Sequence, residues 1–218
     1  MRFIRDSRGA FTLEASLVFP MLFYTVLILL FFCLYLYQST LLGQAAAVAA
    51  ERTAYTWDNS QRDDVTGAYV ENKYDSLYWR LKDDGMLQII FGWSGQNGTE
   101  QISLPSNEAP SGSLPQQKLA RTGGKLPSSM QGAMRYDNQL LLRKVTVGLE
   151  RIVALRPLER WMGEAKQSAR SDAYVVEPVE WIRNVNLARY YGAKFTGRAK
   201  GQKMDKQEAG NALKLFGK

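Results

Sequence analysis

The longest pattern in the chain is an uncharged apolar run over residues 15–37. As a helix, this run of about 23 residues is roughly 34 Å long, which is enough to cross the hydrocarbon core of a bilayer. A helix buried in a soluble protein is rarely apolar on every side. The run therefore predicts a membrane-spanning helix. Pro20 lies in its first part, either as a bend with a role in packing or as a tolerated kink.

The helical pattern does not end with the apolar run. Residues 38–57 continue it with apolar positions at helical spacing, so that residues 10–57 are predicted to form one transmembrane and spine helix. A cluster of alanines between residues 45 and 50 gives the second half of this helix a small face. Alanine favours helices, and small faces let helix backbones approach closely. The polar residues 58–60 are then expected to end the helix.

Residues 58–191 are predicted to form a small α+β domain with a few antiparallel strands and flanking helices. Apolar spacings of three and four indicate helices, and alternation indicates strands. These patterns place helices at residues 61–82 and 178–191, and strands at residues 86–93, 139–155 and 171–176. Residues 94–135 are rich in Gly, Ser, Pro, Asn and Gln and are predicted to be a flexible loop, with a small strand at 101–104. Residues 192–218 are predicted to be a basic, flexible tail.

The formal net charge of +7 is concentrated at the two ends of the chain. Residues 183–218 hold nine Lys and Arg against two Asp and Glu, and the basic leader, residues 1–9, holds three arginines against one aspartate. Positive charge beside a membrane helix favours the cytoplasmic side. The leader therefore predicts a single-pass protein with a cytoplasmic N-terminus and an extracellular C-terminal domain.

One carboxylate, Glu14, lies directly before the apolar run. A carboxylate near a membrane helix costs free energy that falls toward the edge of the bilayer, so Glu14 either sits among the headgroups or has a partner. Cleavage after Gly9 makes Ala10 the new N-terminus and places its amine about one helical turn from Glu14. The amine and the carboxylate then neutralise each other within one chain or between neighbouring chains.

The stretch of residues 8–14, Arg-Gly-Ala-Phe-Thr-Leu-Glu, followed by an unbroken apolar helix, resembles the cleavage motif of type IV prepilins. The spacing from Glu14 to Pro20 is similar to that of TadE-like pilin proteins of tight-adherence (Tad) secretion systems. The resemblance implies that a membrane prepilin peptidase recognises the region of Phe11, Glu14 and Pro20 and cuts between Gly9 and Ala10. It also implies that Glu14 guides subunit assembly and that Pro20 bends the helix for filament packing.

The composition narrows the possible chemistry. The chain has no histidine, and its one cysteine, Cys33, lies in the apolar run, which excludes Ser-His-Asp and Cys-His sites and an intrachain disulfide. The aspartate pairs at 63–64 and 83–84 are interpreted as caps and solvated turns, since they lack further acidic or histidine partners for a metal. Residues 123–125 do not fit a phosphate loop, because leucine follows the lysine. We therefore expect no catalytic residue, metal or cofactor.

The resemblance and the patterns favour a TadE-like minor pilin or pseudopilin, a non-catalytic, membrane-anchored component of a Tad or type IV-like pilus assembly or secretion system. Its expected partners are the prepilin peptidase, other pilin or pseudopilin subunits, and membrane lipid. The basic tail either contacts anionic cell-wall polymer or lipid or is simply solvated. Nucleic acid is not an expected partner, because aromatics are not interleaved with the basic residues.

Two other hypotheses remain open. The first is an uncleaved single-pass membrane protein whose outer domain binds a ligand or partner. The second is an exported enzyme on an anchor, for which the sequence offers no nucleophile–base pair. A hydrolase that uses two carboxylates needs both at one site, and the sequence alone brings no two acids together.

Overall fold

The computed structural model describes residues 10–84, 98–106, 112–139, 142–153 and 165–197. The chain divides into two compact units, Met1–Leu41 and Leu42–Lys218. Helix α1 (Ala10–Tyr55) is 46 residues long and runs from the first unit into the second. The prediction of one long helix over residues 10–57 is therefore confirmed to within two residues at its end.

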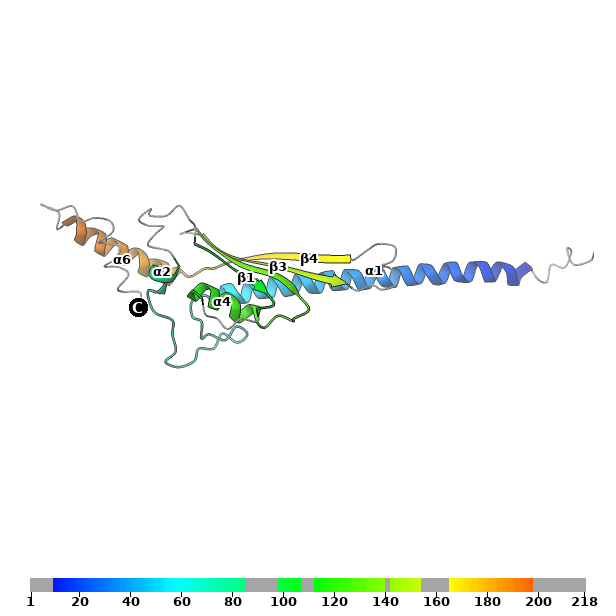
Figure 1. Cartoon of the computed structure of the whole chain (residues 1–218), viewed down its shortest axis with the longest axis horizontal. Helices are drawn as coiled ribbons and strands as arrows, with labels where there is room; N and C mark the ends of the chain where they lie inside the picture. The colour runs from blue at the N-terminus through cyan, green and yellow to red at the C-terminus, as the bar shows by residue number, and fades with distance from the viewer. Residues whose placement is uncertain (1–9, 85–97, 107–111, 140–141, 154–164, 198–218) are drawn as a thin grey trace, which may run out of the picture. The chain divides into compact units, whose positions relative to one another are not determined.

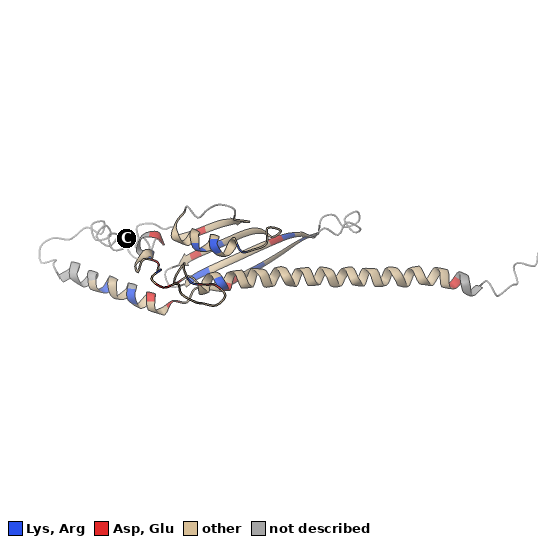
Figure 2. Cartoon of the chain, turned by 90° about the horizontal axis from the view of Figure 1, so that it is seen from below, with Lys and Arg blue, Asp and Glu red and all other residues tan. Residues whose placement is uncertain are grey.

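In the first unit the described residues belong to α1 alone, and they carry no charge after Glu14 (Figure 2). The apolar side chains of this part are exposed on all sides; Leu17, Phe19 and Met21 each expose more than 70 % of their surface. Among the described residues, one helix, Glu14–Tyr55, is long and apolar enough to cross a membrane. Pro20 lies inside α1, which continues beyond it.

The second unit contains a four-stranded antiparallel sheet with the strand order β1-β2-β3-β4 (Figure 1). Helix α4 lies between β1 and β2 in sequence and contacts both strands. The fold is therefore α+β with a long N-terminal helix, as predicted. The remaining elements are β1 (Gly98–Leu104), α4 (Leu114–Gly123), β2 (Gln131–Gln139), β3 (Leu142–Val153), β4 (Ala165–Tyr174), the short α2 (Trp79–Asp83) and α6 (Pro178–Gly197).

The core of the second unit lies between the sheet and the last part of α1. Alternate residues of the two central strands point inward, and Met134 pairs with Val147 and Tyr136 with Val145 in register. The alanine face of α1 belongs to the same core, where Ala46, Ala49 and Ala50 are 0–3 % exposed. The small face therefore lets the helix approach the sheet of its own domain. Trp57, two residues beyond α1, stacks on Tyr136 with ring centroids 4.2 Å apart.

The prediction of a flexible loop at residues 94–135 is wrong for most of its length. This stretch contains β1, α4 and the start of β2. The composition concealed β1 because it is an edge strand in which only Ile102 and Leu104 are apolar, and its order comes from pairing with β2. A start signal for α4 was present, since Pro115 lies in its first turn.

The prediction of a helix at residues 61–82 is also wrong. Only α2 is helical there, and the rest consists of turns. Asp63 Oδ1 accepts hydrogen bonds from the backbone N–H groups of Val65 and Thr66, and such side-chain bonds compete with helical ones.

Near the C-terminus, β4 begins at Ala165, before the predicted 171, and α6 extends to Gly197, so the first residues of the predicted tail are helical. The predicted strand at 86–93 lies outside the described residues.

Candidate functional site

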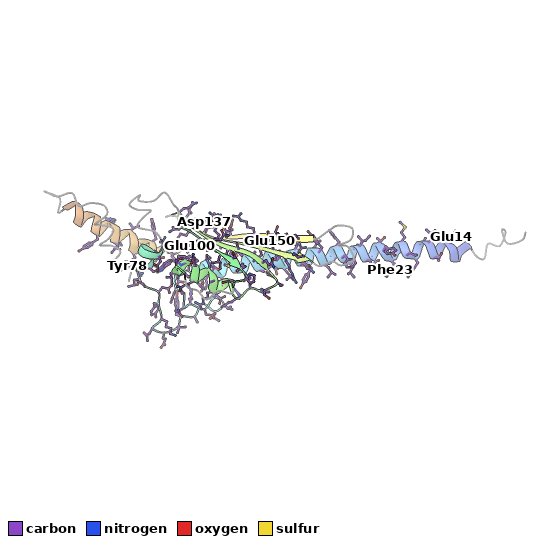
Figure 3. The ribbon with its side chains drawn as sticks, viewed as in Figure 1. Glu14, Phe23, Tyr78, Glu100, Asp137 and Glu150 are labelled. Atoms are coloured by element: carbon purple, nitrogen blue, oxygen red, sulfur yellow. The ribbon has the colours of Figure 1, made fainter. Side chains whose placement is uncertain are left out.

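The predicted processing region lies at the start of α1. Ala10 is the first described residue and belongs to α1, while Gly9 and the side chain of Phe11 lie outside the described part of the chain. Figure 3 places Glu14 at this end of the helix. The Glu14 side chain is exposed.

Two threonine hydroxyls in the first unit form hydrogen bonds within α1. Thr25 Oγ1 donates a hydrogen bond to the carbonyl oxygen of Met21 at 2.8 Å, and Thr40 Oγ1 donates to that of Leu36 at 2.9 Å. Such i to i−4 bonds remove the need for water. The surface of this part is therefore suited to lipid or to other apolar helices. Pro20 is exposed on that surface, where a neighbour can reach it.

A second candidate site is a cavity of about 860 Å³ in the C-terminal unit. Its wall combines the end of α1, the turns of residues 58–77, β4 and the start of α6. Six carboxylates and two guanidiniums line it, together with four tyrosines. Two acidic residues from the start of α6, Glu177 and Glu180, form one side of the cavity.

Behind this side of the cavity lies a cluster of five charged groups, which we call the buried charge cluster. Arg80 Nε donates to Asp84 Oδ2 at 2.8 Å and lies 3.7 Å from Glu180 Oε1. Arg143 Nη1, from β3, lies 3.3 Å from Glu177 Oε2 and 3.4 Å from Glu180 Oε2. All five side chains are 1–13 % exposed. The cluster therefore links α2, the sheet and α6 through charge.

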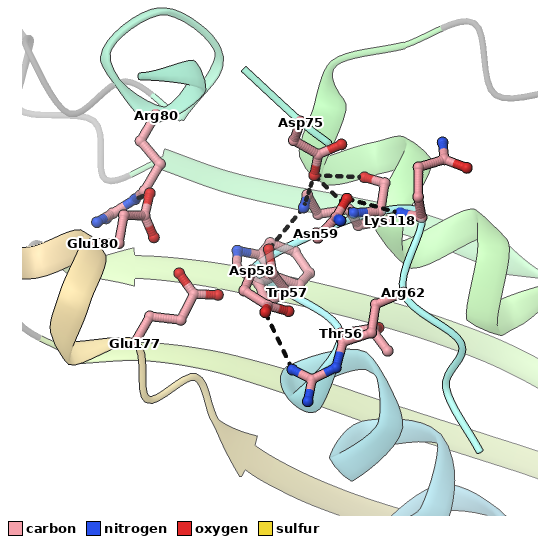
Figure 4. A network of polar contacts seen from close by, with 12 residues as sticks. Thr56, Trp57, Asp58, Asn59, Arg62, Asp75, Arg80, Lys118, Glu177 and Glu180 are labelled. Carbon is pink, nitrogen blue, oxygen red and sulfur yellow. Dashed lines mark hydrogen bonds and ion pairs between the residues drawn. The ribbon is translucent and has the colours of Figure 1, made fainter. Parts of the chain in front are cut away.

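A neighbouring network holds the turns after α1 in place (Figure 4). Lys118 of α4 donates through Nζ to the carbonyl oxygen of Trp57 at 2.7 Å and to Asp75 Oδ2 at 2.5 Å. Asp75 also accepts bonds from the backbone N–H and the hydroxyl of Ser60. On the cavity wall, the Arg62 guanidinium lies 3.9 Å from the ring centroid of Tyr55.

Burial controls the protonation of the cluster. Burial, the hydrogen bond with Glu180 and the charge of Glu180 together raise the pKa of Glu177 to about 8, against the opposing charge of Arg143. Burial also raises the pKa of Asp84, against the opposing charge of Arg80. Burial and the charge of Asp84 raise the pKa of Tyr136, which donates its hydroxyl to Asp84 at 3.1 Å. A pKa of about 8 means that Glu177 holds a proton at neutral pH.

The structure corrects two expectations about acidic residues. Asp64 and Asp84 are buried ion-pair partners, of Lys125 and Arg80, and not solvated turn residues. The structure also brings two acids, Glu177 and Glu180, together at one site. Their spacing of three residues at the start of a helix with proline in its first turn was the available signal.

The paired acids do not have the geometry of a hydrolase. Two carboxylates that flank a glycosidic bond stand about 5 Å or more apart, whereas Glu177 and Glu180 contact each other and the same nitrogen of Arg143. Within the described ranges, no three His, Cys, Asp or Glu side chains are grouped as metal ligands would be. The arrangement is therefore suited to binding charge and a proton.

Comparison of the chain with protein-family models, with curated proteins and with solved structures finds no match in any of the three.

Proposed function

We propose that this protein is a TadE-like minor pilin or pseudopilin, a non-catalytic component of a Tad or type IV-like pilus assembly or secretion system. A prepilin peptidase removes residues 1–9 by cutting after Gly9. The first unit of the processed chain then stays in the membrane as a single helix, with its N-terminus on the cytoplasmic side. The sheet-bearing unit lies outside the cell and serves as the subunit's contact domain.

The observation that carries the proposal is the N-terminal part of α1. Ala10 and Glu14 belong to one helix, so cleavage before Ala10 places Glu14 about one turn from the new amine. The apolar surface that follows is exposed on all sides, so it needs lipid or other helices around it. Pro20 opens one backbone hydrogen bond of the helix and gives it a point at which to bend against a neighbour.

Glu14 has the assembly role in this proposal. In the membrane before assembly, the exposed carboxylate of one subunit is available to the free amine of a neighbour. Pairing removes two charges from a region of low dielectric constant, which favours insertion of a subunit in register with the others. Prepilin peptidase, other subunits and lipid are the partners that this mechanism requires.

The experiment replaces Glu14 with glutamine, which has nearly the same shape and no charge. We expect the Glu14→Gln chain to enter the membrane as the wild type does but to be missing from the fraction sheared from the cell surface. Glu71→Gln is the control, since Glu71 is an exposed acid of the second unit that does not line the cavity. Equal recovery of Glu14→Gln, Glu71→Gln and wild-type chains in the sheared fraction contradicts the proposal.

The second candidate function is that of an uncleaved single-pass membrane protein whose outer domain binds a ligand. The cavity of about 860 Å³ in the second unit favours it, since pockets of this size hold small molecules or peptide segments. The two functions differ at the N-terminus: this candidate keeps residues 1–9, and the minor pilin loses them.

A further inference from the structure

The buried charge cluster lacks one positive charge. Arg80 and Arg143 supply two positive charges, whereas Asp84, Glu177 and Glu180 supply three negative charges. Lys118 of α4 also faces Glu177, but it is already paired with Asp75. Charges that are buried without a partner are costly, so the cluster needs one more cation or a proton.

The missing charge belongs on the cavity side of the cluster. Glu177 lines the cavity, its side chain is 10 % exposed, and its Oε1 receives no donor from any described residue. The carboxyl of Glu180 is bound by the same nitrogen of Arg143 as that of Glu177, so it adds negative charge at this position. A positively charged donor in the cavity would supply the hydrogen bond that Oε1 lacks among the described residues.

The walls of the cavity already bind cations of this chain. The Arg62 guanidinium lies 3.9 Å from the centroid of Tyr55 and 5.0 Å from that of Tyr69, and it bonds to Asp58 at 3.1 Å. Lys118 lies 4.8 Å from the ring centroid of Trp79 while it pairs with Asp75. Aromatic faces beside carboxylates attract ammonium and guanidinium groups. Two exposed tyrosines of the wall, Tyr74 and Tyr174, present further aromatic faces beside these carboxylates.

We propose that this cavity binds a lysine or arginine side chain from the basic segment 198–218 of a second copy of the chain, and that the bound cation pairs with the carboxylate of Glu177. A proton that Glu177 holds before binding passes to the solvent. The inference does not depend on the proposed function, because it concerns the outer unit alone.

Charge and position select this occupant. Residues 198–218 hold six Lys and Arg against two Asp and Glu, while the cavity wall holds six carboxylates against two guanidiniums. The start of α6 belongs to the cavity wall, and the 20 residues of α6 separate that start from residue 198 by roughly 30 Å. The direction of α6 therefore leads away from the cavity of the same copy, so the segment would have to turn back to enter it, and a neighbouring copy is the occupant that we choose.

The test is calorimetric titration of the full chain, in detergent micelles, with a synthetic peptide of residues 198–218. Proton release is measured at each pH by repeating the titration in buffers of different ionisation enthalpy. We expect close to one proton to be released per peptide at pH 7 and almost none at pH 9. Affinity should rise at least about tenfold from pH 6.5 to pH 8.5, since lysine stays charged over this range.

Glu177→Gln is the decisive variant. Glutamine keeps the shape of the side chain and removes the charge deficit, so the variant should fold, bind the peptide at least about tenfold more weakly and release no proton. Glu71→Gln is the matched control, because Glu71 is an exposed acid that does not line the cavity. Equal binding by the two variants, or wild-type binding without proton release, overturns the proposal.

Three further titrations identify the occupant. The peptide with its Lys and Arg replaced by glutamine should not bind, and its binding overturns the proposal. A neutral oligosaccharide that binds in place of the basic peptide overturns it as well. Binding of the peptide to a chain ended after Gly197, but not to the full chain, assigns the cavity to the segment of the same copy and overturns the choice of a second copy.

Discussion

Lys118 Nζ lies 2.5 Å from Asp75 Oδ2, and the two side chains are 3 % and 9 % exposed. The pair joins α4 to the turns that follow α1, two segments that are 43 residues apart in sequence. Lys118 also donates to the carbonyl oxygen of Trp57, the residue whose ring stacks on the central strand β2. One lysine thus connects three parts of the second unit.

Replacing this lysine tests the connection. Lys118→Met should lower the free energy of unfolding of the second unit by about 3–5 kcal/mol, because Asp75 is left as a buried and unpaired charge. Thermal and urea unfolding followed by near-ultraviolet circular dichroism measure the change. Lys73→Met, at an exposed lysine of the same turns, is the control. If Lys118→Met unfolds as Lys73→Met does, the pair does not stabilise the domain.

The alanine face of α1 gives a second prediction. Ala50 is 0 % exposed in the core beside the sheet, so Ala50→Leu should destabilise the second unit by about 1–3 kcal/mol through overpacking. Val48→Leu is the control, since Val48 is 42 % exposed on the same helix. Unfolding by urea measures both. A neutral effect of Ala50→Leu shows that this face does not pack on the sheet.

The buried charge cluster predicts that stability falls as pH rises. The pKa of Glu177 is about 8 in the folded chain against an ordinary value of 4.5. At pH values between these two, the folded state therefore holds a proton that the unfolded state has lost. The stabilisation that protonated Glu177 contributes to folding is fully present below about pH 4.5, and it is lost as the pH rises to about 8. Between pH 6 and pH 9 the loss should be about 2–3 kcal/mol.

Glu177→Gln should abolish this loss, because the amide cannot ionise. Urea unfolding of dilute wild-type and Glu177→Gln chains at pH 6 and pH 9 makes the comparison. The depressed pKa of Asp63, about 2, and the lowered pKa of Asp172 act only in acid, outside this range. A wild-type slope that persists in Glu177→Gln assigns the dependence to other groups.

Sequence patterns predicted those elements whose order comes from their own residues. The apolar run and the alanines predicted α1, the alternation of Val145, Val147 and Leu149 predicted β3, and proline at position 178 predicted the start of α6. Each of these patterns lies within the element that it predicts, because it indicates which face of that element is buried or where a helix begins.

The elements that sequence reasoning missed depend on distant partners. Val65, Tyr69 and Leu77 have helical spacing, yet all three are at least half exposed, so the spacing marked no buried face. β1 owes its order to hydrogen bonds from β2. The buried charge cluster combines residues at 80, 84, 143, 177 and 180. No local pattern reports that charges so far apart in sequence are buried together.

The proposed pilin-like function depends most on cleavage before Ala10. The intact mass of the protein extracted from its native membrane tests this cleavage directly. We predict the mass of a chain that begins at Ala10, nine residues shorter than the printed sequence. The Gly9→Asp chain, whose cleavage site is blocked, should keep the full mass and serves as the control. A native chain that still carries residues 2–9 contradicts the account and leaves a membrane-anchored binding domain.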